Sequence, residues 1–186
     1  LDHLEYTTTQ NGTEMQVVEG TLDHYSTMID YIMNNDLNNA TIYNEIQQRM
    51  NVDSFIDHII MTIYCANTSW GHNREWWRPR EENGKWQWLI VDLDRGFNIN
   101  NSNTNLVDNL KDDYELFHYL LNSPFFVDRF VQRSAAHLSN TFFAERMNSI
   151  VDSLGSMINL EMPRHIDRWG NEGGIPSRTL WERALE

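Results

Sequence analysis

The stretch QWLIVDLDRGFNINN, residues 87–101, decides how the rest of the chain is interpreted. It begins with apolar residues, which favour a buried β-strand, and reaches two carboxylates, Asp92 and Asp94, before a loop rich in Asn. Because side chains two residues apart share one face of a strand, Asp92 and Asp94 are predicted to lie on the same side as Trp86. A carboxylate at the end of a buried strand needs a partner, and a divalent cation is one candidate.

The residues before this stretch predict a β-hairpin. A first strand is expected in REWWRPR (74–80), a turn in EENG (81–84), and a second strand in KWQWLIVDLD (85–94). Asn83 and Gly84 are expected to supply the positive φ angles of a tight turn.

Apolar spacings of three and four predict about six helices around this hairpin. Residues 1–20 are polar and favour an extended connector with one short strand at MQVV (15–18). The chain has no internal repeat, and no stretch rich in Pro, Gly or Ser marks a boundary. We therefore predict a single α+β domain over residues 1–186, mostly helical and built around the β-hairpin.

Composition excludes several classes of function. The formal net charge of -13 opposes nonspecific binding to nucleic acid or anionic lipid. No apolar run reaches the roughly 18–20 residues that a membrane helix needs, so membrane insertion is not expected. Cys65 is the only cysteine and lies in an apolar helical stretch, which indicates a buried, inert thiol. The seven histidines show no zinc-binding spacing.

The Asp-x-Asp motif is weak by itself, because such a pair at a strand end is often only a turn former and helix cap. An EF-hand interpretation fails, since counting from Asp92 puts Gly96 at position five and Asn103 at position twelve. The loop before the hairpin, NTSWGHN (67–73), favours a functional role for the Asp-x-Asp motif. Phosphoryl-transfer sites pair a magnesium-binding carboxylate after a strand with an Asn on a nearby loop, as Asp92 and Asn73 would.

Five segments together resemble the spore-coat protein H (CotH) kinase family of atypical kinases with a protein-kinase-like fold. The resemblance covers most of residues 40–185 and is carried by NTSWGHN (67–73), WWRPR (76–80), GKWQWLIVDLDRGFN (84–98), HIDRWG (165–170) and SRTLWE (177–182). Its most specific part is the Trp-rich strand that ends in Asp-Leu-Asp at a fixed distance from the Asn-Thr-x-Trp loop.

The resemblance implies ATP- and magnesium-dependent phosphorylation of protein Ser or Thr. Asp92 and Asn73 match the family's metal-binding residues, and Asp94 matches the second Asp of its Asp-x-Asp. Trp86 is a candidate for the adenine side of a nucleotide pocket, with packing in the core as an equal alternative. His165, Arg168 and Trp169 are expected to be structural and to close the helical lobe through packing and hydrogen bonds.

The resemblance also implies that the chain is the larger lobe of a kinase. The chain begins at Leu1 and shows no Gly-rich phosphate loop, so the smaller lobe is expected upstream. A secreted, spore-coat or cell-surface protein is favoured by the resemblance alone.

One residue departs from the family pattern. Where the family has a catalytic Asp, this chain has Ser69, and a neutral serine cannot take up the acceptor's proton at neutral pH. His72, three residues later, is a candidate substitute. Three functions remain open: an active kinase, a pseudokinase that binds nucleotide or metal and serves in assembly, and a carbohydrate-binding module with Trp76, Trp77, Trp86 and Trp88 as platforms.

Overall fold

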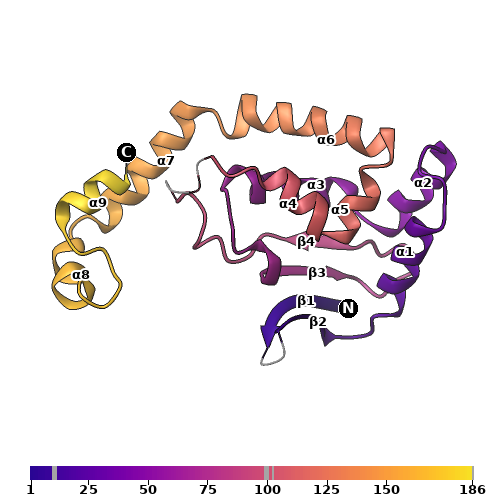
Figure 1. Ribbon diagram of the computed structural model, residues 1–186, viewed down its shortest axis with the longest axis horizontal. Helices are drawn as coiled ribbons and strands as arrows, with labels where there is room; N and C mark the ends of the chain where they lie inside the picture. The colour runs from indigo at the N-terminus through magenta and orange to yellow at the C-terminus, as the bar shows by residue number, and fades with distance from the viewer. Residues whose placement is uncertain (10–11, 99–100, 102, 186) are drawn as a thin grey trace. The chain divides into compact units, whose positions relative to one another are not determined.

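The computed structural model describes residues 1–9, 12–98, 101 and 103–185, and in this part the protein is α+β. Its strands form an antiparallel sheet in the order β2-β1-β3-β4 (Figure 1). The strands are β1 (Asp2–Thr9), β2 (Gly12–Glu19), β3 (Arg74–Arg78) and β4 (Gln87–Leu89).

The helices confirm the predicted mostly helical character. The α-helices are α1 (Asp23–Met33), α2 (Ala40–Arg49), α3 (Val52–Tyr64), α4 (Leu106–Asp113), α5 (Glu115–Leu120), α6 (Pro124–Ala136), α7 (Ala144–Ile158), α8 (Met162–Trp169) and α9 (Arg178–Ala184). A 3₁₀ turn, η1 (Trp70–His72), precedes β3, and a π-helical turn, η3 (His137–Thr141), follows α6. None of the helices in the described part is long and apolar enough to cross a membrane.

The chain packs as two compact units, Leu1–Ser134 and Ala135–Glu186. The first unit contains the sheet and all the predicted site residues. In the second unit, Trp181 and Met162 are buried, and Gly155 leaves room for Leu185, whose methyl groups would lie 3.1 Å from an added Cβ. Trp169 is 43% exposed beneath the Arg168 guanidinium, so its predicted role in packing is not seen.

The β3–β4 hairpin is confirmed, but its turn was wrongly predicted. Trp76 pairs with Trp88, and β4 ends at Leu89 instead of reaching Asp94. Neither Asn83 nor Gly84 has a positive φ. Gly84 is needed for a different reason, because an added Cβ would meet the Pro79 carbonyl oxygen at 2.0 Å.

The strand predicted at MQVV (15–18) lies within β2, but β1 and the pairing of β1 with β2 and β3 were missed. Among the described side chains of β1 and β2, only those of Leu4 and Asp2 are buried, so no apolar alternation marks the strands. Asp2 nevertheless fixes β1 against β3 through ion pairs with Arg78 and Arg80, at 2.9 and 2.7 Å. Burial alone would raise the pKa of Asp2, but hydrogen bonds from Arg80, the Thr21 N–H and Arg78 lower it to about 2.

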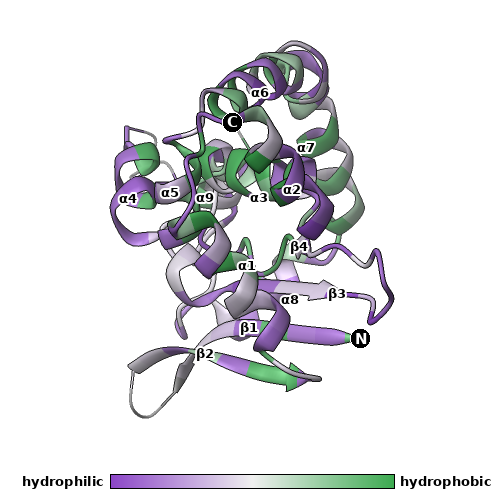
Figure 2. Ribbon diagram, turned by 90° about the vertical axis from the view of Figure 1, so that its right-hand side faces the viewer, coloured by the Kyte–Doolittle hydropathy of each residue, from purple (hydrophilic) through white to green (hydrophobic). Residues whose placement is uncertain are grey.

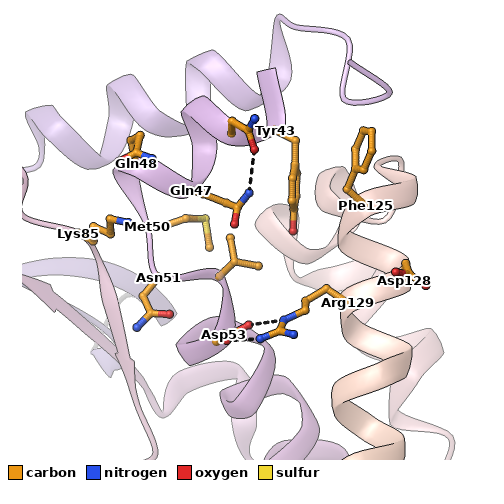
Figure 3. A pocket seen from close by; sticks show the side chains of 12 residues that line it. Tyr43, Gln47, Gln48, Met50, Asn51, Asp53, Lys85, Phe125, Asp128 and Arg129 are labelled. Carbon is orange, nitrogen blue, oxygen red and sulfur yellow. Dashed lines mark hydrogen bonds and ion pairs between the residues drawn. The ribbon is translucent and has the colours of Figure 1, made fainter. Parts of the chain in front are cut away.

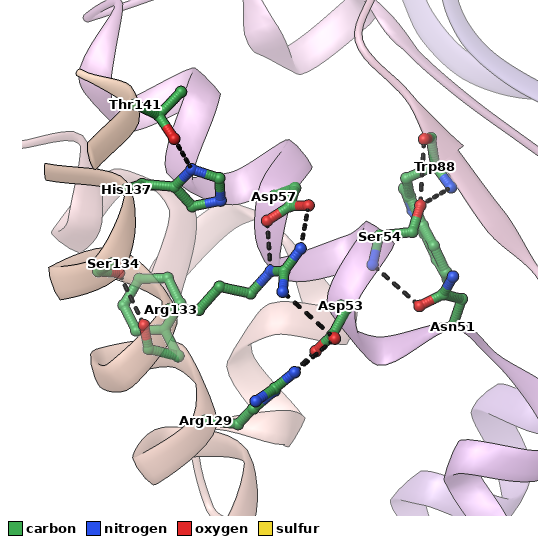
Figure 4. Close-up of polar contacts among 11 residues, drawn as sticks. Asn51, Asp53, Ser54, Asp57, Trp88, Arg129, Arg133, Ser134, His137 and Thr141 are labelled. Atoms are coloured by element: carbon green, nitrogen blue, oxygen red, sulfur yellow. Dashed lines mark hydrogen bonds and ion pairs between the residues drawn. The ribbon is translucent and has the colours of Figure 1, made fainter. Parts of the chain in front are cut away.

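Helix α3 forms the centre of the core, as predicted. Phe55, Ile56 and Ile59 are fully buried, and the helix packs along β4. Figure 2 shows much of α3 in green, whereas β1 is mostly purple and white. The opposite side of α3 carries Asp53 and Asp57, which pair with Arg129 and Arg133 of α6 (Figure 4).

His58 of α3 joins the helix to β4 and is expected to make stability depend on pH. Its Nδ1 lies 3.0 Å from the Leu89 carbonyl oxygen, and burial lowers its pKa to about 4 from 6.5, with the charge of Arg74 acting in the same direction. As the pH falls, His58 therefore binds a proton near pH 6.5 in the unfolded chain but only near pH 4 in the folded chain.

We predict that His58 stabilises the fold fully above pH 6.5 and that this contribution, roughly 3 kcal/mol, is lost as the pH falls toward 4. Urea unfolding between pH 7.5 and 4 should show a weaker pH dependence in His58→Asn than in the wild type. His165→Asn, at an exposed histidine, is the matched control. Equal pH dependence in His58→Asn and the wild type would contradict the assignment.

Candidate functional site

Two loops meet where the sequence analysis placed a site. Asn73 lies between η1 and β3, and Asp92 lies three residues beyond the end of β4. The Asn73 side-chain amide donates a hydrogen bond to Asp92 Oδ2 at 2.8 Å. Because β3 and β4 pair antiparallel, the start of one strand and the end of the other come together at one edge of the sheet.

The first loop is held in place by Asn67, which the sequence analysis did not single out. Helix α3 is followed by Ala66 at φ 50°, which turns the chain so that Asn67 becomes buried. The Asn67 amide donates to the Asp92 backbone carbonyl at 3.3 Å, and its oxygen accepts from the Ser69 N–H at 3.0 Å. Asn67 thus connects the backbone of both loops.

The position expected for a catalytic base holds a serine paired with a histidine. Ser69 Oγ lies 3.2 Å from His72 Nε2, and the Asn73 amide approaches the same oxygen at 3.5 Å. The 3₁₀ turn η1 brings Ser69 and His72 together, since residues three apart eclipse in that geometry. The arrangement can pass a proton between Ser69 Oγ and His72 Nε2.

Asp92 has a left-handed backbone conformation, with φ 47°, and an exposed side chain. This conformation costs a residue with a Cβ on the order of 1 kcal/mol in free energy, and Asp tolerates it better than most residues. The bonds from Asn67 and Asn73 stabilise this conformation and leave the carboxylate within reach of a ligand.

The segment after Asp92 returns to the end of α3. The Phe97 N–H donates to the Cys65 carbonyl at 2.6 Å, and the Phe97 ring contacts Tyr64. Gly96 is required here, because an added Cβ would lie 3.0 Å from the Leu93 carbonyl oxygen and 3.1 Å from Cys65 Cβ. Burial raises the pKa of the Cys65 thiol to about 11, in agreement with the predicted inert thiol.

Other predicted site residues lie elsewhere. Asp94 is exposed and, within the part of the chain that the structure describes, makes no hydrogen bond to Asn73 or Asp92. Trp86 is fully buried, donates to His24 Nδ1 at 3.0 Å and meets Tyr25 edge to face. Its surroundings favour the core-packing alternative over contact with adenine.

The burial of the tryptophans also weighs against a carbohydrate platform. Trp76, Trp86 and Trp88 are 2%, 0% and 6% exposed, and only Trp77 of the four proposed platform residues is partly accessible. A sugar ring needs an accessible aromatic face, which three of these four side chains do not offer.

A cavity of about 220 Å³ lies beside Asp92, between the start of β3 and β1. Asn73, His72 and Arg74 line it together with Glu5 and Glu75. A larger cavity of about 790 Å³ lies at the other end of β4, beside Lys85 (Figure 3). Its Tyr43 and Phe125 rings stack on each other, and Asp53 is already paired with Arg129.

The residues at Asp92 fit a magnesium ion that arrives with a nucleotide. Magnesium usually binds one or two protein carboxylates and completes its shell with water and substrate phosphates. Asp92 offers an accessible carboxylate, and the Asn73 side-chain amide lies beside it, with its nitrogen 2.8 Å from Asp92 Oδ2. No group of three or more His, Cys, Asp or Glu that could hold a metal by itself occurs among the described residues.

Comparison with known families now identifies the class of protein. The sequence matches the model of the family described as CotH kinase protein over residues 2–186. The chain therefore belongs to the CotH kinase family, and the resemblance noted in the sequence is confirmed. A search of curated proteins found no match. A search of solved structures found none either.

The left-handed conformation of Asp92 gives a testable order of stabilities. Both Asp92→Gly and Asp92→Ala lose the bond to Asn73, but only Ala keeps the Cβ that disfavours φ 47°. We expect Asp92→Gly to be more stable than Asp92→Ala by about 1 kcal/mol in urea unfolding, the reverse of the usual order. Ala as stable as Gly would show that residue 92 is not left-handed in solution.

Proposed function

We propose that this protein is a kinase that binds ATP with magnesium at Asp92 and Asn73 and transfers phosphate to Ser or Thr of a protein substrate. The observation that carries the proposal is the hydrogen bond between the Asn73 amide and the Asp92 carboxylate. It joins the two residue types that hold magnesium in protein kinases, on the same kinds of loop. Membership of the CotH kinase family supports a kinase-like function in general.

Asp92 and Asn73 would hold the metal, which when bound neutralises charge on the phosphates. Asp94 is a further candidate ligand from the family pattern. Ser69 and His72 have the arrangement of a proton relay. The acceptor hydroxyl would give its proton to Ser69 Oγ as Ser69 gives its own to His72 Nε2. The acceptor oxygen would bond to the γ-phosphorus while the bond from that phosphorus to the β,γ-bridging oxygen breaks, and ADP would leave.

A pseudokinase is the second candidate, and Ser69 is the observation that favours it. A serine relay is a weaker base than a carboxylate in direct contact with the acceptor, and losing a positioned base typically costs roughly a hundred- to ten-thousand-fold. On this alternative the protein binds the magnesium–nucleotide complex at the same residues and acts in assembly without phosphate transfer.

We predict that Asp92→Asn weakens magnesium-dependent ATP binding at least about tenfold in calorimetric titration. Asn tolerates φ 47° and can still accept from Asn73, so the fold should be preserved while the charge that attracts the cation is lost. Asp152→Asn removes an equal charge from exposed α7 and should bind as the wild type does. Unchanged binding in Asp92→Asn would contradict the site.

We predict that Ser69→Asp raises phosphotransfer by about a hundredfold or more, because it restores a carboxylate beside Asn73. Ser69→Asn, of similar size and neutral, is the matched control and should not gain activity. The assay is transfer of labelled γ-phosphate to a mixed protein substrate. His72→Gln should lower transfer in the wild type if the relay operates, and a wild type with ATP binding but no transfer would favour the pseudokinase.

A further inference from the structure

Arg74, the first residue of β3, is a buried cation surrounded by aromatic rings. The side chain is 7% exposed. Its guanidinium carbon lies 4.2 Å from the centre of the Tyr6 ring, 4.4 Å from that of Tyr114 and 5.3 Å from that of Trp70. The rings offset part of the hydration that the guanidinium loses on burial, and the Tyr114 hydroxyl also forms a hydrogen bond with the Arg74 side chain.

The edge of this guanidinium is poorly satisfied. Nη2 donates to the Gly71 carbonyl at 3.2 Å, whereas Nε is buried without a hydrogen-bond partner. Within residues 1–9, 12–98, 101 and 103–185, no carboxylate forms an ion pair with Arg74. Buried charges are normally paired, so a cation that binds no acid of its own chain indicates an anion from outside.

A cavity beside Arg74 has the lining that an oxyanion requires. Its volume is about 420 Å³, and it opens between η1, β1 and α4. Residues whose side chains carry hydrogen-bond donors line it together with Arg74, namely Thr13, Thr68, His72 and Asn109. Asp113 is the one carboxylate in the lining, and it is exposed to water, which screens its charge.

The position of this cavity connects it with the candidate catalytic loop. Ser69 and Asn73 of that loop form the cluster with Asp92, while Thr68, Gly71 and Arg74 line the cavity. His72 belongs to both, because its ring contacts Ser69 and also lines the cavity. A phosphate in the cavity would therefore contact the same loop whose Asn73 side chain binds Asp92.

We propose that this cavity, which we call the Arg74 cavity, binds a phosphate group, with the Arg74 guanidinium as its main ligand. Guanidinium and phosphate match in charge and in the spacing of donors and acceptors. The phosphate belongs either to the nucleotide or to a phosphorylated acceptor peptide, an assignment that rests on the proposed kinase function. The phosphate site itself does not depend on that function.

The first test uses inorganic phosphate as the probe. The unfolding temperature is measured against phosphate concentration at ionic strength held constant with chloride. Phosphate also stabilises proteins nonspecifically, so the increment must be compared between variants. In Arg74→Met, the part of the rise in unfolding temperature that comes from specific phosphate binding should be lost. The apparent affinity for phosphate should be at least about tenfold weaker. Arg164→Met, which removes an equal charge from an exposed site, should keep it.

Two further measurements test the proposal if Arg74→Met does not fold. Thr68→Val leaves the charge unchanged and removes one donor at an exposed position, so it should weaken phosphate binding without unfolding the protein. In the wild type, the Arg74 Nε–H resonance should shift on adding phosphate and not on adding chloride. Equal phosphate increments in Arg74→Met and Arg164→Met, or an unmoved resonance, would overturn the proposal.

The source of the phosphate is identified by measuring how tightly Arg74→Lys and the wild type bind different phosphate compounds. Lysine keeps the positive charge but loses the paired donors of the guanidinium. Weaker binding of ATP with unchanged binding of ADP assigns the site to the terminal phosphate. Weaker binding of a phosphoserine peptide, with unchanged binding of its unphosphorylated form, assigns it to the acceptor. In Asp92→Asn the phosphate increment should persist, so failure of the metal site and failure of the Arg74 cavity give different results.

Discussion

The hydrogen bond of 2.8 Å between the Asn73 amide and the Asp92 carboxylate is the contact on which the candidate site depends. It joins the loop that leaves α3 to the segment that leaves β4. The two loops are held relative to each other by this bond and by Asn67, which donates to the Asp92 carbonyl. The elements on either side supply the rigidity: α3 packs on β4, and β3 pairs with β4.

The hydrophobic core explains why this edge of the sheet is well positioned. Phe55 of α3 packs against Trp88, and Trp88 Nε1 donates to the Tyr114 hydroxyl at 3.1 Å. Trp76 and Trp86 fill the space beneath α1 through contacts with Tyr25. The aromatic residues therefore form a packed core that supports the two polar loops. Because most of their rings are buried in this core, few of them are accessible to a sugar.

The sequence was sufficient for the parts of the structure that carry a clear period. Alternation in residues 74–94 predicted the hairpin, and spacings of three and four predicted α3 and its buried face. The convergence of Asn73 and Asp92 was also predicted, because a hairpin brings the start of one strand to the end of the other. The structure adds a protein partner for Asp92 that was not predicted, because within the described residues its carboxylate accepts a hydrogen bond from the Asn73 amide.

What could not be predicted depended on contacts between distant residues. The pairing of β1 with β2 has no apolar pattern and depends on backbone bonds, while the ion pair of Asp2 with Arg78 joins β1 to β3. Ile90 lies within the predicted strand 85–94, yet β4 ends one residue before it and Ile90 is 50% exposed. The burial of Asn67 and of Arg74 follows from how loops fold over the core, for which single residues in sequence give no signal.

The central claim is that Asn73 and Asp92 form one metal–nucleotide site. Crystals grown with manganese and a non-hydrolysable ATP analogue test it most directly, because manganese takes the oxygen ligands of magnesium and scatters anomalously. The account predicts an anomalous peak about 2.1 Å from an Asp92 carboxylate oxygen, with the Asn73 amide oxygen beside it. A nucleotide and metal bound elsewhere, with the Asn73–Asp92 hydrogen bond unchanged, would contradict the account.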